Sequence, residues 1–304
     1  MKKILILTYY WPPKGGVGVQ RWLKLSKYLK DDFKVSIFTP KGGEYSFLDT
    51  TLNSEIPIEI EELRLKIFEP QVLLNFFFKK QVSQDVLISK NPSILNKLLI
   101  WIRANFFIPD TRALWINKSV KFLNNYLMSH KVDCIISTGP PHSMHMIALK
   151  LIQKNNIKWI ADFRDPWTEI EYFEQLPLTS CARNKHFRLE QKVLKTANLV
   201  LSVSQSWAHN LLSKGAKSVH VVHNGYDLSD YDFNKKKSNL DFTVGHFGLY
   251  NQLRDHSFFW DVINDLTTNI ADFRANLKLL FVGQIYCGFL DIMNQKSLAD
   301  KIQF

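Results

Sequence analysis

The chain has 304 residues, 46% of them hydrophobic, and a formal net charge of +11. This composition excludes a disordered chain, and no apolar run approaches the roughly 18 residues that a membrane-spanning helix needs. The length predicts two domains. The three cysteines are scattered, which excludes a metal or redox motif and favours a reducing, cytoplasmic setting.

The N-terminal segment predicts a buried strand over Lys3–Thr8. A signal peptide is excluded because the apolar stretch Ile4–Leu7 is short and is followed by Trp11-Pro12-Pro13, with no small-residue cleavage site. After the turn Gly15-Gly16-Val17-Gly18, apolar residues from Val19 to Leu29 share one face of a predicted helix.

Strands and helices are then expected to alternate to residue 226. Helices are predicted from the turn Gly139-Pro140-Pro141 to Ile152, where apolar residues keep helical spacing, over Asn184–Lys195, and between the last two strands. The further predicted strands are Lys34–Thr39, Ile56–Ile60, Val132–Thr138, Ile157–Ala161, Leu199–Val203 and Ser218–Val222. This alternation predicts an α/β domain with a doubly wound parallel sheet.

Residues 71–130 interrupt the alternation with a helical excursion that is both basic and aromatic. It holds eight Lys or Arg residues, two acidic residues and nine aromatic residues, including Phe76-Phe77-Phe78, Trp101 and Trp115. This composition is typical of an interfacial membrane surface, and equally of a solvated basic face over an aromatic core. No nucleic-acid-binding module is recognisable, so DNA or RNA is not an expected partner.

A polar stretch, residues 227–241, is predicted to link a second, partial α/β domain over residues 242–304. That domain is expected to contain a strand over Phe242–Phe247, a helix over Phe258–Ile270, a strand over Leu277–Val282 and a helix from Phe289 to about Asp300. Its length is short for a doubly wound domain.

The turn Gly15-Gly16-Val17-Gly18 is predicted to contact a phosphate. Glycines let the backbone approach an anion, and the following helix N-terminus favours negative charge. NAD is disfavoured, because Arg21 occupies the third glycine position of the dinucleotide fingerprint and the second strand ends at Thr39 instead of an acid. A tight turn that needs glycine φ angles is the alternative.

Polar residues also follow two later strands. His142 comes after the strand ending at Thr138, and Asp162, Arg164 and Asp165 come at the end of the next strand. Ligands bind at the carboxyl edge of open α/β sheets, so we expect one shared site there; a structural ion pair between Arg164 and an aspartate is the alternative. No metal is expected, because His142 and His145 lack a third ligand at metal spacing.

These motifs resemble bacterial glycosyltransferase family 4. The resemblance covers about residues 1–230 and rests on WPPKGGVGVQR, STGPPHS, WIADFRDPW and HNGYD; RANFFIPDTRALWI resembles a segment of one branch, and VGHFGLY with Arg254 resembles the donor-phosphate loop. The resemblance implies a GT-B fold and retaining transfer from a nucleotide-diphosphate sugar, used as co-substrate without cofactor or metal.

The same resemblance implies the roles of the predicted site residues. His142 would lie near the transferred sugar, and Asp162, Arg164 and Asp165 would line the acceptor side. The donor phosphates would be contacted by glycines and a guanidinium, namely Gly15, Gly16, Gly18, Gly248 and Arg254. The basic aromatic excursion fits a glycan or lipid-linked acceptor in cell-surface polysaccharide synthesis, and a cytoplasmic protein peripheral on the inner face of the membrane.

One departure from the family lies in the second domain. The family carries a glutamate pair there, and this sequence has no glutamate after Glu190; Glu61 and Glu69 share the spacing but lie in the first domain. We therefore expect a truncated chain that binds donor weakly or not at all. The alternatives are a non-catalytic remnant or membrane-associated binding module, and, less favoured, a GT-B sugar-nucleotide epimerase.

Overall fold

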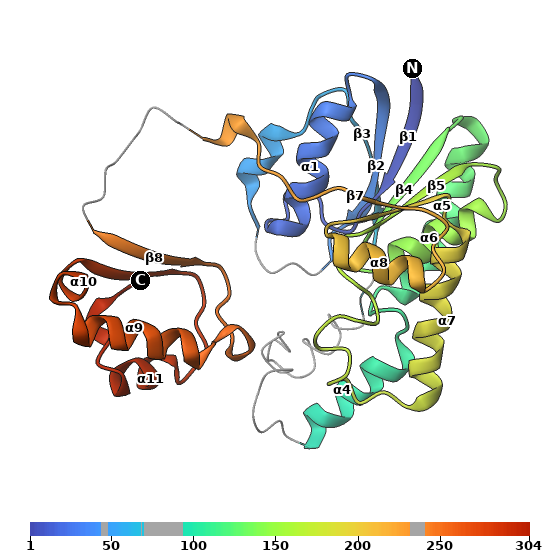
Figure 1. Ribbon diagram of the computed structural model, residues 1–304. Coiled ribbons are helices and arrows are strands. Elements are labelled where there is room, and N and C mark those ends of the chain that lie inside the picture. Colours follow the sequence, from blue (N-terminus) through green and yellow to red (C-terminus); the bar gives the residue numbers. More distant parts are fainter. Residues whose placement is uncertain (44–47, 68, 70–93, 232–240) are drawn as a thin grey trace. The chain divides into compact units, whose positions relative to one another are not determined.

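The computed structural model describes residues 1–43, 48–67, 69, 94–231 and 241–304 (Figure 1). The chain divides into two compact units, Met1–Asp227 and Leu228–Phe304.

The first unit is built on a seven-stranded parallel sheet with the order β3-β2-β1-β4-β5-β6-β7. Its strands are β1 (Lys2–Leu7), β2 (Phe33–Lys41), β3 (Glu61–Lys66), β4 (Cys134–Gly139), β5 (Lys158–Phe163), β6 (Leu199–Ser202) and β7 (Val219–Val221). The doubly wound parallel sheet predicted from the alternation is confirmed.

The strand predicted over Ile56–Ile60 is wrong. The chain forms a 3-10 helix over Thr50–Glu55 and a turn, and the edge strand β3 follows, paired with β2 from Ser36 opposite Glu61 to Lys41 opposite Lys66. Ile60 is buried and Ile56 packs against the same core, whereas Ile58 is 95% exposed, so these apolar residues anchor a turn and do not form a strand. An edge strand has one unpaired side, and the polar sequence EELRLK suits that position.

Helices cover both faces of this sheet (Figure 1). Along β1, Ile4 and Ile6 join a core with α1, whereas Leu5 and Leu7 join a larger core with α5, α6 and α7. This follows from the two-residue period of a strand, which sends successive side chains to opposite faces. The described helices of the unit are α1 (Val17–Leu29), α4 (Ile94–Phe106), α5 (Ile116–Ser129), α6 (Ser143–Ile152), α7 (Ser180–Thr196) and α8 (Gln205–Ser213).

The strand order reverses between β1 and β4. From β1 the chain proceeds to β2 and β3 on one side, and β4 then pairs with the other side of β1 and continues outward to β7. The loops after β1 and β4 therefore leave the sheet in opposite directions at its carboxyl edge, which is where ligands bind in open α/β sheets.

The helical excursion is described from residue 94 onward, and Phe76-Phe77-Phe78 lies outside the described residues. Helix α4 has no buried residue, and it exposes several large apolar side chains while carrying Lys97 and Arg103 and no acid. The exposed apolar residues are Ile94, Leu95, Leu98, Trp101, Ile102 and Phe106. Among the described helices, none combines the length and apolarity needed to cross a bilayer.

The second unit has a three-stranded parallel sheet with the order β10-β9-β8. The strands predicted over Phe242–Phe247 (β8) and Leu277–Val282 (β9) are confirmed, and the sequence did not reveal β10 (Ile302–Gln303) or α10 (Ala271–Asn276). Helix α9 spans Ser257–Asn269, and α11 spans Phe289–Gln295 and so ends before the predicted Asp300. An aromatic core that includes Trp260, Phe281 and Phe289 fills the space between sheet and helices.

Candidate functional site

Arg164 joins the three strand-end loops at the carboxyl edge of the first sheet. Its Nη1 donates to the carbonyl of Gly18 at 3.1 Å, and its Nη2 donates to the carbonyl of Pro140 at 3.1 Å. The guanidinium also lies over the ring of Tyr10, 5.5 Å from the centroid, and Nε is 3.7 Å from the Asp165 carboxylate. One side chain from the β5 loop therefore fixes the β1–α1 loop against the β4–α6 loop.

Gly18 contributes to this junction by its lack of a side chain. A β-carbon there would lie 3.0 Å from Arg164 Nη1 and 3.0 Å from Tyr10 Cδ2. The close approach that requires glycine at this position is thus to Arg164. Gly16, at the N-cap of α1, has φ of 99°, a conformation that favours glycine, and no side chain caps the helix.

Asp162 is fully buried, and the protein itself satisfies it. Arg21 donates to both carboxylate oxygens, from Nη2 at 2.9 Å and from Nε at 3.2 Å. Oδ2 also accepts from Trp22 Nε1 and from Thr138 Oγ1, both at 2.8 Å. The alternative interpretation, an ion pair between Arg164 and an aspartate, does not apply to Asp162, whose cation is Arg21. Among the described contacts Arg164 pairs with Asp165, whose side chain is partly exposed.

His142 is held by aromatic stacking. Its ring lies parallel to the indole of Trp167, with centroids 4.5 Å apart, and Trp167 is fixed because its Nε1 donates to His186 Nδ1 at 3.1 Å. Burial, reinforced by His145, His186 and Arg164, holds the pKa of His142 well below its usual range. His142 is therefore a neutral imidazole at physiological pH.

A buried glutamate fixes the turn that carries Trp167. Glu190 on α7 accepts from Thr168 Oγ1 at 2.5 Å and pairs with Lys214 Nζ at 3.1 Å. The turn after β5 is thereby tied to α7 and to the end of α8. These contacts hold Trp167, on which His142 stacks, in place.

A second buried cluster lies beside the glycine turn. Lys14 donates to the Tyr9 carbonyl at 3.0 Å and lies over the Tyr9 ring, while Glu69 accepts from Tyr9 Oη at 2.9 Å and pairs with Arg112 Nε at 2.7 Å. Burial lowers the pKa of Lys14 to about 7, against the raising effect of Glu69. Asp110 accepts from the backbone N–H of Ser143 at 2.8 Å and so brings the same segment to the start of α6.

In the second unit, Gly248 and Arg254 lie in the loop after β8. Gly248 has φ of 112°, and Arg254 is exposed with Nη1 donating to the carbonyl of Leu249 at 3.2 Å. A β-carbon on Gly283 would lie 2.2 Å from the Gly248 carbonyl oxygen, so the ends of β8 and β9 meet through two glycines. Arg254 also lines a cavity of about 250 Å³ with His246, His256 and aromatic side chains.

The sequence model of "Glycosyltransferase Family 4" matches residues 15–230 of the chain. The chain belongs to glycosyltransferase family 4. The match contains every predicted site residue of the first unit. No curated protein sequence matches the chain significantly.

Solved structures show the fold of this family 4 chain. The chain is 16% identical to Anabaena HepE, solved in complex with UDP and glucose, with a TM-score of 0.56. The match covers 100% of this chain and 69% of HepE. The chain is 13% identical to sucrose-phosphate synthase from Thermosynechococcus elongatus (TM-score 0.50, 100% and 70% covered). It is 12% identical to the N-terminal domain of Candida albicans trehalose-6-phosphate phosphatase (TM-score 0.56, 98% and 68% covered). The predicted GT-B-like fold is thereby confirmed.

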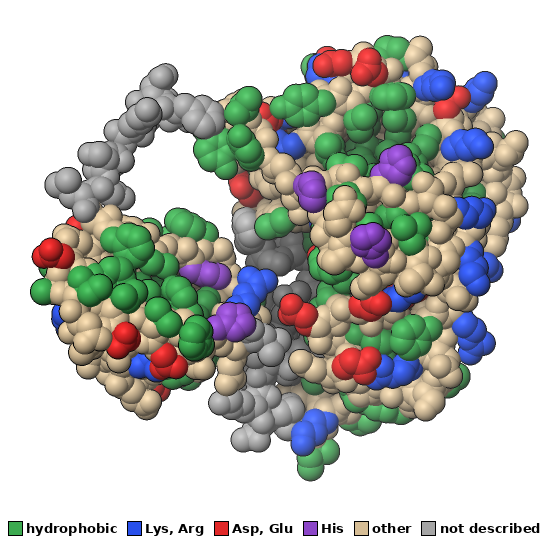
Figure 2. Space-filling model, viewed as in Figure 1, with side chains coloured by type: hydrophobic (Ala, Val, Ile, Leu, Met, Phe, Trp, Pro, Cys, Tyr) green, Lys and Arg blue, Asp and Glu red, His purple; other side chains and the backbone are tan. Residues whose placement is uncertain are grey.

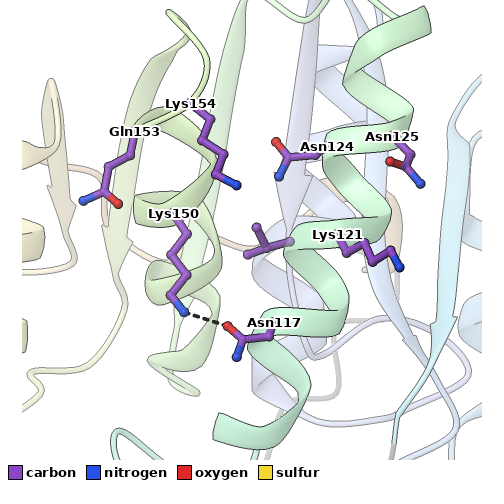
Figure 3. A pocket seen from close by; sticks show the side chains of 8 residues that line it. Asn117, Lys121, Asn124, Asn125, Lys150, Gln153 and Lys154 are labelled. Atoms are coloured by element: carbon purple, nitrogen blue, oxygen red, sulfur yellow. Dashed lines mark hydrogen bonds between the residues drawn. The ribbon is translucent and has the colours of Figure 1, made fainter.

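A separate hollow on this glycosyltransferase contains none of the predicted site residues. It is a groove of about 600 Å³ between α5 and α6, where three lysines and several amides line the walls and Lys150 Nζ donates to Asn117 Oδ1 at 2.7 Å (Figure 3). No carboxylate is among its lining residues. Basic side chains also stand along the side of the first unit that α5, α6 and α7 cover (Figure 2).

The structure of this family 4 chain adds residues that sequence reasoning did not assign. Arg21 in the sequence indicates only the lack of a dinucleotide fingerprint, and His145 only the lack of a metal site. Lys14 and Trp167 lie in the segments WPPKGGVGVQR and WIADFRDPW, which carry the family resemblance and are the sequence signal for both residues. Among the described residues, no group of three His, Cys, Asp or Glu side chains could hold a metal ion.

Proposed function

We propose that this chain transfers a sugar from a nucleotide-diphosphate sugar to a glycan or lipid-linked acceptor. The observation that carries the proposal lies at the carboxyl edge of the sheet, where the strand order reverses. There Arg164 binds the start of α1 and the β4–α6 loop together beside a stacked, neutral His142. Family membership supports sugar transfer as the reaction, and complexes of Anabaena HepE with UDP-glucose and with UDP and glucose support a nucleoside-diphosphate donor.

In this proposal the residues divide into two groups. His142 contacts the transferred sugar as a neutral hydrogen-bonding group, and Asp165, which is half-exposed, faces the acceptor side. Asp162 and Arg164 act by holding the loops, since Asp162 has no exposed surface and both nitrogens at the end of the Arg164 guanidinium are bonded to carbonyls.

The glycine turns contact the donor phosphates. Gly15, Gly16 and Gly18 lie at the uncapped N-terminus of α1, where backbone N–H groups and the helix dipole favour an anion. In the second unit, Gly248 and the exposed Arg254 supply backbone and guanidinium donors, which suit a leaving diphosphate because charge-assisted bidentate contacts are the strongest available.

Isothermal titration of the chain with a panel of uridine and guanosine diphosphate sugars tests the donor class. The proposal predicts weak binding of one donor, because the sequence has no glutamate after Glu190 to contact the sugar and ribose. Arg254→Ala should weaken that binding by about a further tenfold or more, in line with removal of a charged hydrogen bond. Arg274→Ala is the matched control, because Arg274 is also exposed in the second unit and pairs only with Asp300 in the described contacts. A folded chain that binds no donor supports the non-catalytic binding module instead.

We further propose that the protein associates with an anionic membrane surface. Helix α4 supports this, because it exposes apolar side chains and carries only positive charge, the combination that binds the interface of anionic bilayers. The lysines of the α5–α6 groove add to the same charge.

Co-sedimentation with vesicles tests this association. Vesicles containing phosphatidylglycerol should bind the chain more strongly than neutral phosphatidylcholine vesicles, and Leu98→Ser with Phe106→Ser should weaken that binding. Ile58→Ser is the control, because Ile58 is the most exposed of these apolar residues and lies on a turn outside the helix. Equal binding by the α4 variant and the control would contradict the proposal.

A further inference from the structure

Two buried histidines face the same small space above Gly139. A β-carbon on Gly139 would lie 2.6 Å from His145 Nε2 and 2.8 Å from His142 Nδ1. Both nitrogens are completely buried, and neither has a hydrogen-bond partner. Gly139 therefore leaves open the place where two polar atoms from the first turn of α6 converge.

The tautomer of His145 follows from its other contact. Trp159 Nε1 donates to Ser137 Oγ at 2.9 Å, and Ser137 Oγ is 2.8 Å from His145 Nδ1. An indole N–H only donates, and Ser137 Oγ has no other hydrogen-bond partner among the described contacts. The Ser137 hydroxyl proton is therefore satisfied only if His145 Nδ1 accepts it. Burial lowers the pKa of His145 to about 3, so the ring is neutral and carries its proton on Nε2, toward Gly139.

His142 presents the complementary atom. Its Nδ1 is the buried nitrogen, whereas its Nε2 is neither completely buried nor hydrogen-bonded among the described contacts. A neutral imidazole has one donor and one acceptor nitrogen, and leaving a buried polar atom unpaired costs about 1–3 kcal/mol. The arrangement that pairs both buried atoms puts an acceptor at His142 Nδ1 opposite the donor at His145 Nε2.

We propose that His145 is a positioning residue for His142: a hydrogen-bond path, direct or through one water molecule, runs from His145 Nε2–H to His142 Nδ1 and keeps the His142 proton on Nε2. The outward nitrogen of His142 is then a hydrogen-bond donor, suited to a hydroxyl or carbonyl oxygen of a ligand and unsuited to acting as a base. This inference rests on the proposed function only for the identity of that ligand as the transferred sugar.

Long-range 1H–15N correlation spectra of the ligand-free chain, labelled with 15N-histidine, test the path. The expected result is protonated Nε2 and unprotonated Nδ1 for both His142 and His145, with assignment from His142→Gln and His145→Gln. A proton on Nδ1 of His142 in the unaltered chain overturns the proposal. Because no donor is needed, this result is independent of whether the chain binds a nucleotide sugar.

Variants separate positioning from simple packing. His145→Leu removes the donor, and we expect mixed tautomers of His142; His145→Gln restores an N–H at similar reach and should return the proton to Nε2. His209→Leu, an exposed histidine on α8, is the control and should change nothing. If His145→Leu fails to fold, the Gln variant and the unaltered chain still decide, and an unchanged His142 spectrum in folded His145→Leu contradicts the path.

Discussion

Replacing Arg21 with leucine should destabilise the first unit through the aspartate that it leaves behind. The Arg21 side chain is 3% exposed and that of Asp162 is 0% exposed, so the pair is removed from water. In Arg21→Leu, Oδ2 keeps the donors from Trp22 and Thr138, and Oδ1 loses its bond to Nη2. Breaking a buried ion pair on one side costs about 3–5 kcal/mol, and the two remaining donors favour the lower end, about 3 kcal/mol.

This loss has a second contribution from the end of the sheet. Arg21 Nη1 donates to Asn224 Oδ1 at 3.0 Å and to the His223 carbonyl at 3.3 Å, which ties α1 to the segment after β7. For a unit of this size, about 3 kcal/mol corresponds to a fall in Tm of roughly 6–12 °C.

Urea unfolding followed by circular dichroism measures the change, and a double-mutant cycle assigns it. Arg21→Leu with Asp162→Asn removes the uncompensated charge, so the double variant should be more stable than the sum of the two single changes predicts, by about 1.5 kcal/mol or more. Arg64→Leu breaks the partly exposed pair with Glu62 and a bond to the Pro12 carbonyl, and it should cost less than Arg21→Leu because neither partner is a fully buried charge. A cost below 1 kcal/mol for Arg21→Leu, or simple additivity in the cycle, would refute the reasoning.

Three further changes have calculable outcomes. Lys14 has a folded pKa of about 7, lowered from 10.5, so between these pH values the unfolded chain binds more protons and the free energy of unfolding rises with pH. Lys14→Met should abolish about 2.5 kcal/mol of this rise between pH 7.5 and 9.5, as measured by urea unfolding at both pH values. Gly283→Ala should destabilise the second unit by more than about 2 kcal/mol, because the new β-carbon would collide with the Gly248 carbonyl. Gly225→Ala is the control, because a β-carbon there meets no atom within 4 Å. Equal shifts in Tm for the two variants would contradict the predicted collision. Thr168→Val removes the hydroxyl bond to Glu190 and should cost about 1–2 kcal/mol. An unchanged melt would show that Lys214 and the backbone N–H of residue 168 are enough to satisfy the carboxylate.

The sequence predicts elements well where burial and periodicity agree. β1 is apolar on both sides because helices cover both faces of the sheet, and the apolar spacing of α6 survives because almost all of it is buried. The strand predicted over Ile56–Ile60 was wrong for the opposite reason. Its isoleucines lie in a turn, and the strand that follows, β3, is a polar edge strand.

The sequence predicted where the candidate residues lie in the sheet, but not which side chains pair with each other. Glycine turns and charged residues after successive strands indicate the carboxyl edge of a parallel sheet, and His142, Asp162 and Arg164 do lie there. The partner of Asp162 is 141 positions away on α1, which follows β1, and β4 alone separates β1 from β5 in the sheet. Such contacts depend on strand order, which local pattern does not specify.

The release of nucleoside diphosphate from a nucleotide sugar tests the central claim most directly. The chain should be incubated with each donor of the uridine and guanosine panel and a glycolipid acceptor fraction, with His142→Leu as the matched variant. Sugar transfer predicts that one donor, at a concentration high enough to offset weak binding, yields nucleoside diphosphate above the buffer rate. The His142 variant should reduce this rate while the fold is retained. A folded chain that releases none from any donor would contradict the account.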